Sequence, residues 1–263
     1  TEVTPAKIEQ AFDEIAAKVE DRPQDKVVVF LAGHTGVFNS NRFCLLLPGY
    51  QFPANEPYLA SARGAAPDQG ARNKELDPNA VLPYATVAAN MIRLKALDRL
   101  IIVDACQAES ILEDPQVVEI QKWIELGSRK VRTSYLMAAR RGEPAIEVDP
   151  LGHGLFTYTL LRGMGAIDPG NDPEEIVKLN LPGNADFNGD SVLSTTELNQ
   201  YITEHLDEIA ATYPTMVASR QAVLPASEAS KLTESLVQRP LLQSFGDPFP
   251  LVPLTARNAR QNR

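Results

Sequence analysis

The sequence predicts an α/β protein with a mainly parallel sheet flanked by helices. Runs of β-branched and aliphatic residues, typical of buried strands, occupy residues 26–33, 99–106 and 134–140. Amphipathic helical patterns over residues 80–97 and 114–127 separate these runs. Strands that alternate with helices run parallel in one sheet, because each helix returns the chain to the same end of the sheet.

A helix over residues 4–20 precedes the first strand. Thr4 can cap this helix and Pro5 suits its first turn. Its apolar side chains fall on one stripe, at Ile8, Phe12, Ile15 and Val19. The run at 26–33 then predicts a strand buried on both faces.

The segments between the first two buried strands are less regular. Residues 41–50 predict a short strand that ends at Pro48-Gly49. Residues 51–79 are rich in Pro, Gly, Ala and Asn, which is typical of an exposed loop.

The last part of the chain changes character. Residues 152–164 predict a short helix after a glycine-rich entry, and residues 195–213 predict a strongly helical segment. The tail from residue 238 is rich in proline, so we expect it to lack regular structure and to pack its apolar residues on the core.

Composition excludes several classes of function. The chain has 263 residues, with 25 Lys and Arg against 34 Asp and Glu, a net charge of −9. This balance argues against a nucleic-acid partner and is compatible with a basic peptide or protein substrate. Apolar runs such as 27–32 are too short to span a membrane, so no membrane partner is expected. The two cysteines, Cys44 and Cys106, favour a reducing, cytoplasmic location.

Two buried strands lead into reactive side chains. His34 follows the run at 26–33, and Cys106 ends the run at 99–106. Sites in parallel sheets form at the carboxyl ends of the strands, so we expect this pair at one edge. There the imidazole can take the thiol proton and later protonate a leaving amine, while nearby main-chain N–H groups stabilise an oxyanion.

Other readings of these residue types stay open. A cysteine at a strand end is usually core, and Cys44 in its apolar strand is expected to be packing. His153 and His205 compete for the role of base. His205 is expected to be solvated on a polar helix, and His153 to be structural.

Three segments together resemble a known family. LAGHTG (31–36), DACQAES (104–110) and GHGLFTYTLLRG (152–163) resemble the bacterial, metacaspase-like branch of the caspase-like cysteine peptidases. The resemblance implies that Cys106 is the nucleophile and His34 the base, with the N–H groups of Thr35 and Cys106 serving the oxyanion. It implies a cysteine endopeptidase that works through a thioester, cleaves after Arg or Lys, and is regulated by calcium and by self-processing.

The resemblance also suggests how specificity arises. Asp104 lies two residues before Cys106, so strand alternation places both on one face. The resemblance implies that Asp104 binds the basic side chain of the substrate in a pocket that Ala32 also lines. Metacaspase-like members often carry Ser where this chain has Ala32. An ion pair of Asp104 with Arg140 is the structural alternative.

The chain departs from the family pattern in two further ways. Thr35 replaces the usual Gly after the His, so Gly36 is expected to supply any positive φ. The strand and helix that normally precede the His-bearing strand are missing, which predicts an apolar edge at 27–31. We therefore expect an N-terminal segment or a partner chain to complete the sheet. These departures motivate the alternative function, a catalytically inactive caspase-like regulatory or interaction module.

Residues 186–197 match a calcium-binding loop. The oxygen donors at its positions 1, 3, 5, 7, 9 and 12 are Asp186, Asn188, Asp190, Val192, Ser194 and Glu197. Position 6, normally Gly, is Ser191, which suits the sharp turn poorly. The alternative is a metal-free turn that leads into a capped helix. No cofactor is expected for catalysis itself.

These observations divide the chain into three expected regions. Residues 1–166 form the peptidase core, residues 167–214 an EF-hand-like loop and helix, and residues 215–263 a proline-rich segment that packs on the core. Candidate self-cleavage points lie in basic loops, at Arg63, Arg72, Arg129, Lys130 and Arg132. A solvated basic loop without cleavage is the alternative at each point.

Overall fold

The computed structural model describes residues 3–38, 42–50, 78–127, 130–141, 143–220 and 238–254, except for the side chains at 123–127 and 214–220. The chain forms two compact units. Unit 1 comprises Thr1–Pro144 with Leu241–Asp247, and unit 2 comprises Ala145–Pro240 with Pro248–Arg263. The predicted exposed loop at 51–79 lies almost entirely outside the described residues.

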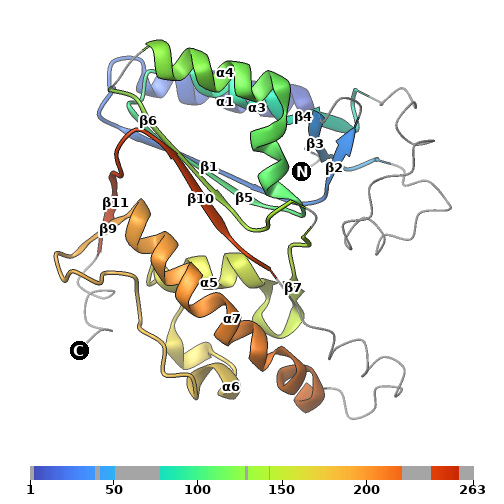
Figure 1. Cartoon of the computed structure of the whole chain (residues 1–263), viewed down its shortest axis with the longest axis vertical. Coiled ribbons are helices and arrows are strands. Elements are labelled where there is room, and N and C mark those ends of the chain that lie inside the picture. Colours follow the sequence, from blue (N-terminus) through green and yellow to red (C-terminus); the bar gives the residue numbers. More distant parts are fainter. Residues whose placement is uncertain are drawn as a thin grey trace. The chain divides into compact units, whose positions relative to one another are not determined.

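Unit 1 contains the predicted mainly parallel sheet (Figure 1). Its strands, in spatial order, are β1 (Lys26–Ala32), β5 (Asp98–Asp104), β6 (Arg132–Met137) and β10 (Leu241–Phe245). The first three are parallel, whereas β10 runs antiparallel to β6. The expectation that the proline-rich tail lacks regular structure is therefore wrong. The prolines flank the strand at Pro240 and beyond Gly246, and β10 itself has no proline to interrupt the ladder.

Strand β1 forms one edge of this sheet among the described strands. Its inward face packs on the core, but Val28 and Phe30 on the other face are 52% and 47% exposed. Their partners in β5, Leu100 and Ile102, are buried. The predicted apolar edge is present, whereas the prediction of burial on both faces is wrong because Val28 and Phe30 stay exposed on one face of β1.

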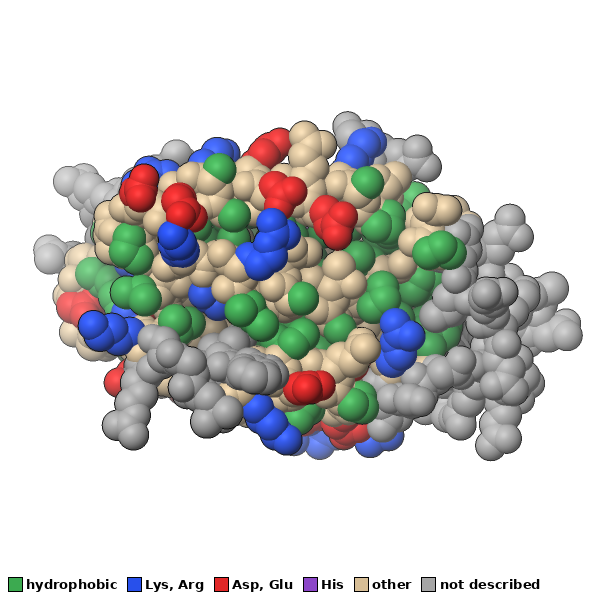
Figure 2. Space-filling view, turned by 90° about the horizontal axis from the view of Figure 1, so that it is seen from above, with side chains coloured by type: hydrophobic (Ala, Val, Ile, Leu, Met, Phe, Trp, Pro, Cys, Tyr) green, Lys and Arg blue, Asp and Glu red, His purple; other side chains and the backbone are tan. Residues whose placement is uncertain are grey.

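Three helices cover one face of this sheet (Figure 1). They are α1 (Pro5–Val19), α3 (Tyr84–Arg93) and α4 (Pro115–Gly127). The predicted cap is confirmed, since the Thr4 hydroxyl accepts a hydrogen bond from the N–H of Lys7 at 3.4 Å. Figure 2 shows acidic and basic side chains interspersed with apolar ones on the face it presents.

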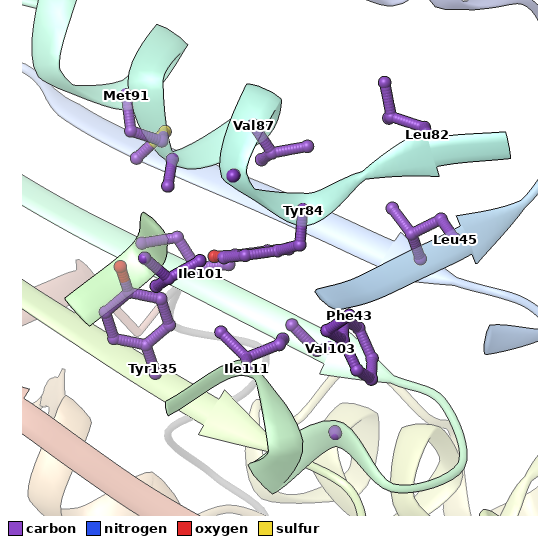
Figure 3. Packing of buried hydrophobic residues seen from close by; sticks show 14 of the residues in the cluster. Phe43, Leu45, Leu82, Tyr84, Val87, Met91, Ile101, Val103, Ile111 and Tyr135 are labelled. Carbon is purple, nitrogen blue, oxygen red and sulfur yellow. The ribbon is translucent and has the colours of Figure 1, made fainter. Parts of the chain in front are cut away.

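A second, three-stranded antiparallel sheet stands beside the first in unit 1. It consists of β2 (Thr35–Phe38), β3 (Arg42–Leu46) and β4 (Val81–Pro83). The predicted helix over 80–97 starts only at Tyr84, because residues 81–83 pair with β3. Side chains of β3, α3 and β5, including Phe43, Tyr84 and Ile101, meet in the core (Figure 3).

Unit 2 is built around two helices. Helix α5 (Leu155–Gly163) packs on α7 (Thr195–Arg220), and a methyl group at Gly163 would come within 2.9 Å of the Tyr201 ring. Glycine therefore allows this close approach. The remaining elements are β7 (Glu147–Val148), η4 (Asp149–Leu151), β8 (His153–Gly154), η5 (Pro169–Asn171), α6 (Glu174–Val177), β9 (Val192–Ser194) and β11 (Pro250–Pro253).

A buried polar network holds α5 in unit 2. The side chains of Arg162 and Asp172 form an ion pair in which they are 5% and 1% exposed. The Tyr158 hydroxyl donates to the second oxygen of Asp172 at 2.5 Å. Because Tyr158 and Arg162 are one helical turn apart on α5, a single carboxylate accepts hydrogen bonds from both side chains.

Among the described residues, none of the helices combines the length and the apolar character that crossing a bilayer requires.

Candidate active site

The register of β1 and β5 places His34 and Cys106 at the same edge of the sheet. Ala32 pairs with Asp104 in the parallel ladder, and the N–H of Gly33 donates to the Asp104 carbonyl at 3.2 Å. His34 and Cys106 each lie two residues beyond this pair. They therefore enter adjacent loops at the carboxyl ends of neighbouring parallel strands.

The turn after β1 depends on Gly33. This residue has φ +147°, a conformation that side chains disfavour, and β1 ends at this point. Gly36, which the sequence predicted would supply the positive φ, instead lies within strand β2. Gly33, three residues before Gly36, allows the turn, so Thr35 needs no unusual backbone conformation.

Thr35 connects the two loops directly. Its hydroxyl donates to the Cys106 carbonyl at 2.6 Å, between residues 71 positions apart in the chain. On the other side, the N–H of Leu46 donates to the His34 carbonyl at 2.9 Å, next to the Thr35–Leu45 pair of the antiparallel ladder. In that pattern Thr35 is a non-hydrogen-bonded position, so its own N–H faces away from β3.

The turn after Cys106 contains a strained residue that sequence reasoning missed. Gln107 has φ 57° and ψ 28°, the left-handed region that residues other than glycine rarely occupy. Its N–H donates to the Glu143 carbonyl at 2.9 Å, and the N–H of Glu109 donates to the Ala139 carbonyl at 3.1 Å. The short 3-10 helix η3 (Ala108–Glu113) begins immediately afterwards. Strain of this kind concentrates at functional sites, and no sequence pattern for Gln signals it.

The two cysteines occupy contrasting environments. Both are free thiols, and Cys106 is half-buried whereas Cys44 is fully buried in β3, as the sequence predicted. Burial raises the pKa of the Cys44 thiol to about 11; Asp114 also raises it, and Arg42 partly opposes the shift. Cys44 is therefore a buried packing residue whose thiol resists ionisation, and Cys106 is the more exposed of the two cysteines.

The predicted specificity residues lie two positions before the predicted catalytic residues in the chain. Asp104 is half-buried and Ala32 is exposed, and both project from the face of the sheet that carries Val28 and Phe30. Their pairing in the ladder places them side by side. The role of Asp104, in substrate binding or in an ion pair with Arg140, stays a prediction.

The other histidines lie in unit 2. His153 lies in β8 and pairs with Val148 of β7. The prediction that His205 is solvated is wrong: its side chain is 14% exposed, and its ring lies against that of Tyr201 with the centroids 4.6 Å apart. The position of Tyr201 one turn earlier on α7 makes this packing possible.

The candidate self-cleavage points differ in their surroundings. Arg63, Arg72 and Arg129 lie outside the described residues. Lys130 is exposed. Arg132 belongs to β6, where its guanidinium forms two 2.7 Å hydrogen bonds with Asp98. Because a protease needs an extended, accessible segment, Arg132 is a poor point for cleavage.

The predicted calcium loop connects α6 to α7 in unit 2. Val192 and Ser194 lie in β9, and Glu197 lies in the first turn of α7. Ser191 adopts φ 63°, so this position does take the left-handed turn despite having a side chain. Among the described residues, no group of three or more His, Cys, Asp or Glu side chains is arranged to hold a metal ion. A site here would therefore depend on amide, hydroxyl and carbonyl oxygens as well as carboxylates.

Comparison of the chain with protein-family models, curated proteins and solved structures gives no match.

Proposed function

We propose that the chain is a caspase-like cysteine endopeptidase that cleaves peptide bonds after Arg or Lys. The observation that carries the proposal is the register of β1 and β5, which brings His34 and Cys106 to adjacent loops at one sheet edge. The link from the Thr35 hydroxyl to the Cys106 carbonyl supports it, because it holds the two loops in contact. The resemblance of the three segments at 31–36, 104–110 and 152–163 to this family supplies the reaction class.

The proposed reaction has two steps. The imidazole of His34 takes the proton of the Cys106 thiol, and the sulfur attacks the carbonyl carbon of the scissile bond. The amine departs with the proton from the imidazolium, which leaves a thioester on Cys106. Water then attacks the thioester with His34 again as the base, which releases the carboxylic acid and restores the thiol.

Main-chain donors next to the pair would stabilise the oxyanion in both steps. The N–H of Thr35 faces away from β3, which supports its assignment as one donor. The N–H of Cys106 is the second proposed donor. Fixed N–H groups of this kind are effective because they need no reorganisation when charge develops.

Specificity for a basic residue rests on Asp104. Asp104 is the last residue of β5, two positions before Cys106, and pairs with Ala32 of β1. A half-buried carboxylate forms strong charge-assisted hydrogen bonds with a guanidinium or an ammonium group. The net charge of −9 is compatible with the same preference.

An inactive caspase-like regulatory or interaction module is the second candidate. Thr35 in place of the usual Gly favours it, because this position departs from the pattern of the family that the chain resembles. Such a module keeps the fold of the site without turnover.

The test is a panel of fluorogenic peptides with Arg, Lys or Asp before the cleaved bond, assayed under reducing conditions with and without added Ca²⁺. We expect turnover of the Arg and Lys peptides by the wild type. Cys106→Ala should lower kcat/KM by on the order of 10⁴-fold. The matched control is Cys44→Ala, which removes the buried thiol and should retain turnover.

Three outcomes would contradict the proposal. Turnover by Cys106→Ala would show that Cys106 is not the nucleophile. Turnover of the Asp peptide alone would show that Asp104 does not select a basic residue. Absence of turnover with every peptide favours the inactive module. If the chain cleaves itself, the wild type should release fragments that end at Lys130. Identical fragments from Cys106→Ala would show that the chain does not cleave itself.

A further inference from the structure

The loop at residues 186–197 has the backbone shape of a cation-binding loop. The N–H of Asp190 donates to the side-chain oxygen of Asn188 at 2.8 Å, and the N–H of Val192 donates to Asp190 at 2.8 Å. Gly189 and Ser191 both adopt positive φ, at 74° and 63°. These turns fold the chain back on itself within a few residues.

Two carboxylate oxygens in this loop are buried without a partner. Glu197 is only 8% exposed; its Oε2 accepts from the N–H and the hydroxyl of Ser194 at 3.0 and 2.8 Å, while its Oε1 is buried and accepts no hydrogen bond. The two carboxylate oxygens of Asp186 differ in the same way. Its Oδ2 accepts from the N–H of Ser191 at 3.1 Å, and its Oδ1 is buried and unsatisfied.

These oxygens need a positive partner. A buried ionised carboxylate is costly when one of its oxygens has no donor, and among the described residues neither Asp186 nor Glu197 forms an ion pair. A turn followed by a capped helix, the metal-free alternative, explains the bonds of Ser194 to Glu197 but leaves both oxygens without a role. A bound cation explains the bonds and the orphaned oxygens together.

We propose that residues 186–197 bind Ca²⁺ through Asp186, Asn188, Asp190, Ser194, Glu197 and the main-chain carbonyl of Val192. The three carboxylates are not gathered as one group among the described residues, so binding draws them together. This donor set contains carboxylate, amide, hydroxyl and carbonyl oxygens and lacks sulfur and imidazole, which suits a hard cation and excludes a zinc-type site. Ca²⁺ fits better than Mg²⁺, because it accepts six to eight oxygens in flexible geometry, whereas Mg²⁺ demands a tight octahedron.

Binding would stabilise the fold of unit 2. Glu197 opens α7, and Val192 and Ser194 belong to β9, which pairs with β11 (Figure 1). The N–H of Leu254 also donates to the Ser191 carbonyl at 2.9 Å. A cation held by the loop therefore ties the start of α7 to a pair of strands from distant parts of the sequence, and it should raise the unfolding temperature.

The test titrates the whole chain, freed of metal with a chelator, with Ca²⁺ or Mg²⁺ by calorimetry and follows thermal unfolding in parallel. We expect one Ca²⁺ per chain, weaker binding of Mg²⁺ and a higher Tm with Ca²⁺. Glu197→Gln and Asp186→Asn should each weaken Ca²⁺ binding by on the order of tenfold or more, because each removes a charged ligand. Asp207→Asn, an exposed carboxylate on α7, is the matched control and should bind as the wild type does.

Either of two results overturns the inference. One is no saturable binding of Ca²⁺ by the wild type up to about 10 mM, beyond the weakest known class of such loops. The other is wild-type affinity in both loop variants. If Glu197→Gln fails to fold, as judged by circular dichroism, the Ca²⁺ affinity of Asp186→Asn tests the inference. Because the measurement is binding, its outcome is independent of peptidase activity.

Discussion

The site at the ends of β1 and β5 joins Thr35 to Cys106 across 71 positions of the chain, whereas the loop at 186–197 draws its donors from one short segment. The first exists only when two strands pair in the correct register. The second is formed by short-range turns whose hydrogen bonds span at most five residues. A substitution in either strand can therefore disturb the first site from a distance, while the turns of the loop depend mainly on its own sequence and β9 on its pairing with β11.

The two sites nevertheless share one feature. The non-glycine residues with positive φ in the described part of the chain are Gln107, Asn180 and Ser191. Gln107 follows the proposed nucleophile, and Ser191 lies within the proposed calcium loop. Each site thus keeps a strained backbone that its surroundings stabilise, which is a common property of functional sites.

The largest expected effect separates the accessible thiol of the first site from the buried one. At pH 7.5, alkylation of Cys106 by iodoacetamide should exceed that of Cys44 by on the order of a thousandfold. With its pKa raised to about 11, the Cys44 thiol is almost entirely protonated at this pH, and its burial blocks the reagent. Peptide mass spectrometry over time measures both rates, and equal rates would contradict the comparison.

The pH dependence of alkylation gives a sharper comparison of the two thiols. Alkylation of Cys44 should rise steadily up to about pH 11, since more thiolate forms as the pH approaches its pKa. Alkylation of Cys106 should reach its plateau at lower pH, because the proposed imidazole of His34 stabilises the thiolate. His34→Ala should shift only the Cys106 profile to higher pH, and a shift of both profiles would indicate a general loss of structure.

The next effect tests whether the loop depends on the scaffold of unit 2. Asp172→Asn removes the charge partner of buried Arg162 and weakens the bond from Tyr158, so it should lower the free energy of unfolding by about 3 kcal/mol. Urea denaturation measures this, with exposed Asp207→Asn as the control. At temperatures where the variant remains folded, Ca²⁺ affinity should be unchanged, and a large loss would contradict the local character of the loop.

A smaller effect concerns specificity at the first site. Asp104→Asn should reduce kcat/KM for Arg peptides by about 10- to 100-fold, since it replaces a charge-assisted contact of roughly 1.5–3 kcal/mol. Turnover of a peptide with a neutral residue at the same position should change far less. Equal losses for both peptides would mean that Asp104 supports the structure rather than the selection of substrate.

The smallest effect concerns the strained residues. Ser191→Gly should stabilise unit 2 by up to about 1 kcal/mol, because glycine adopts positive φ without strain but loses more freedom on folding. Gln107→Gly should stabilise unit 1 by a similar amount. Chemical denaturation measures both, and destabilisation by either variant would show that the side chain contributes contacts that outweigh the strain.

Sequence reasoning was most successful where the signal is local. The helix at α1 with its cap at Thr4, the strands β1, β5 and β6, and the parallel order they imply all follow from short-range periodicity. The turns of the loop at 186–197 were predictable for the same reason, since the spacing of its polar residues determines them.

The remaining features depend on distant parts of the chain. Nothing in Leu241–Phe245 indicates that it joins β6, because the pairing is determined by the rest of the sheet. Likewise, Val28 and Phe30 have the composition of buried residues, and their exposure depends on what lies beside β1. The strain at Gln107 comes from the bonds to Glu143 and Ala139 around it, which are long-range features too.

Strand β10 has a consequence for how the molecule is made. It completes the sheet of unit 1, although the 96 residues before it, Ala145–Pro240, belong to unit 2. While the ribosome synthesises those residues, β6 stays without its outer neighbour, an open edge on a nascent polypeptide. Unit 1 can therefore reach this sheet only after residues 145–240 have been synthesised, so a chaperone that shields β6 until then would raise the yield of folded protein.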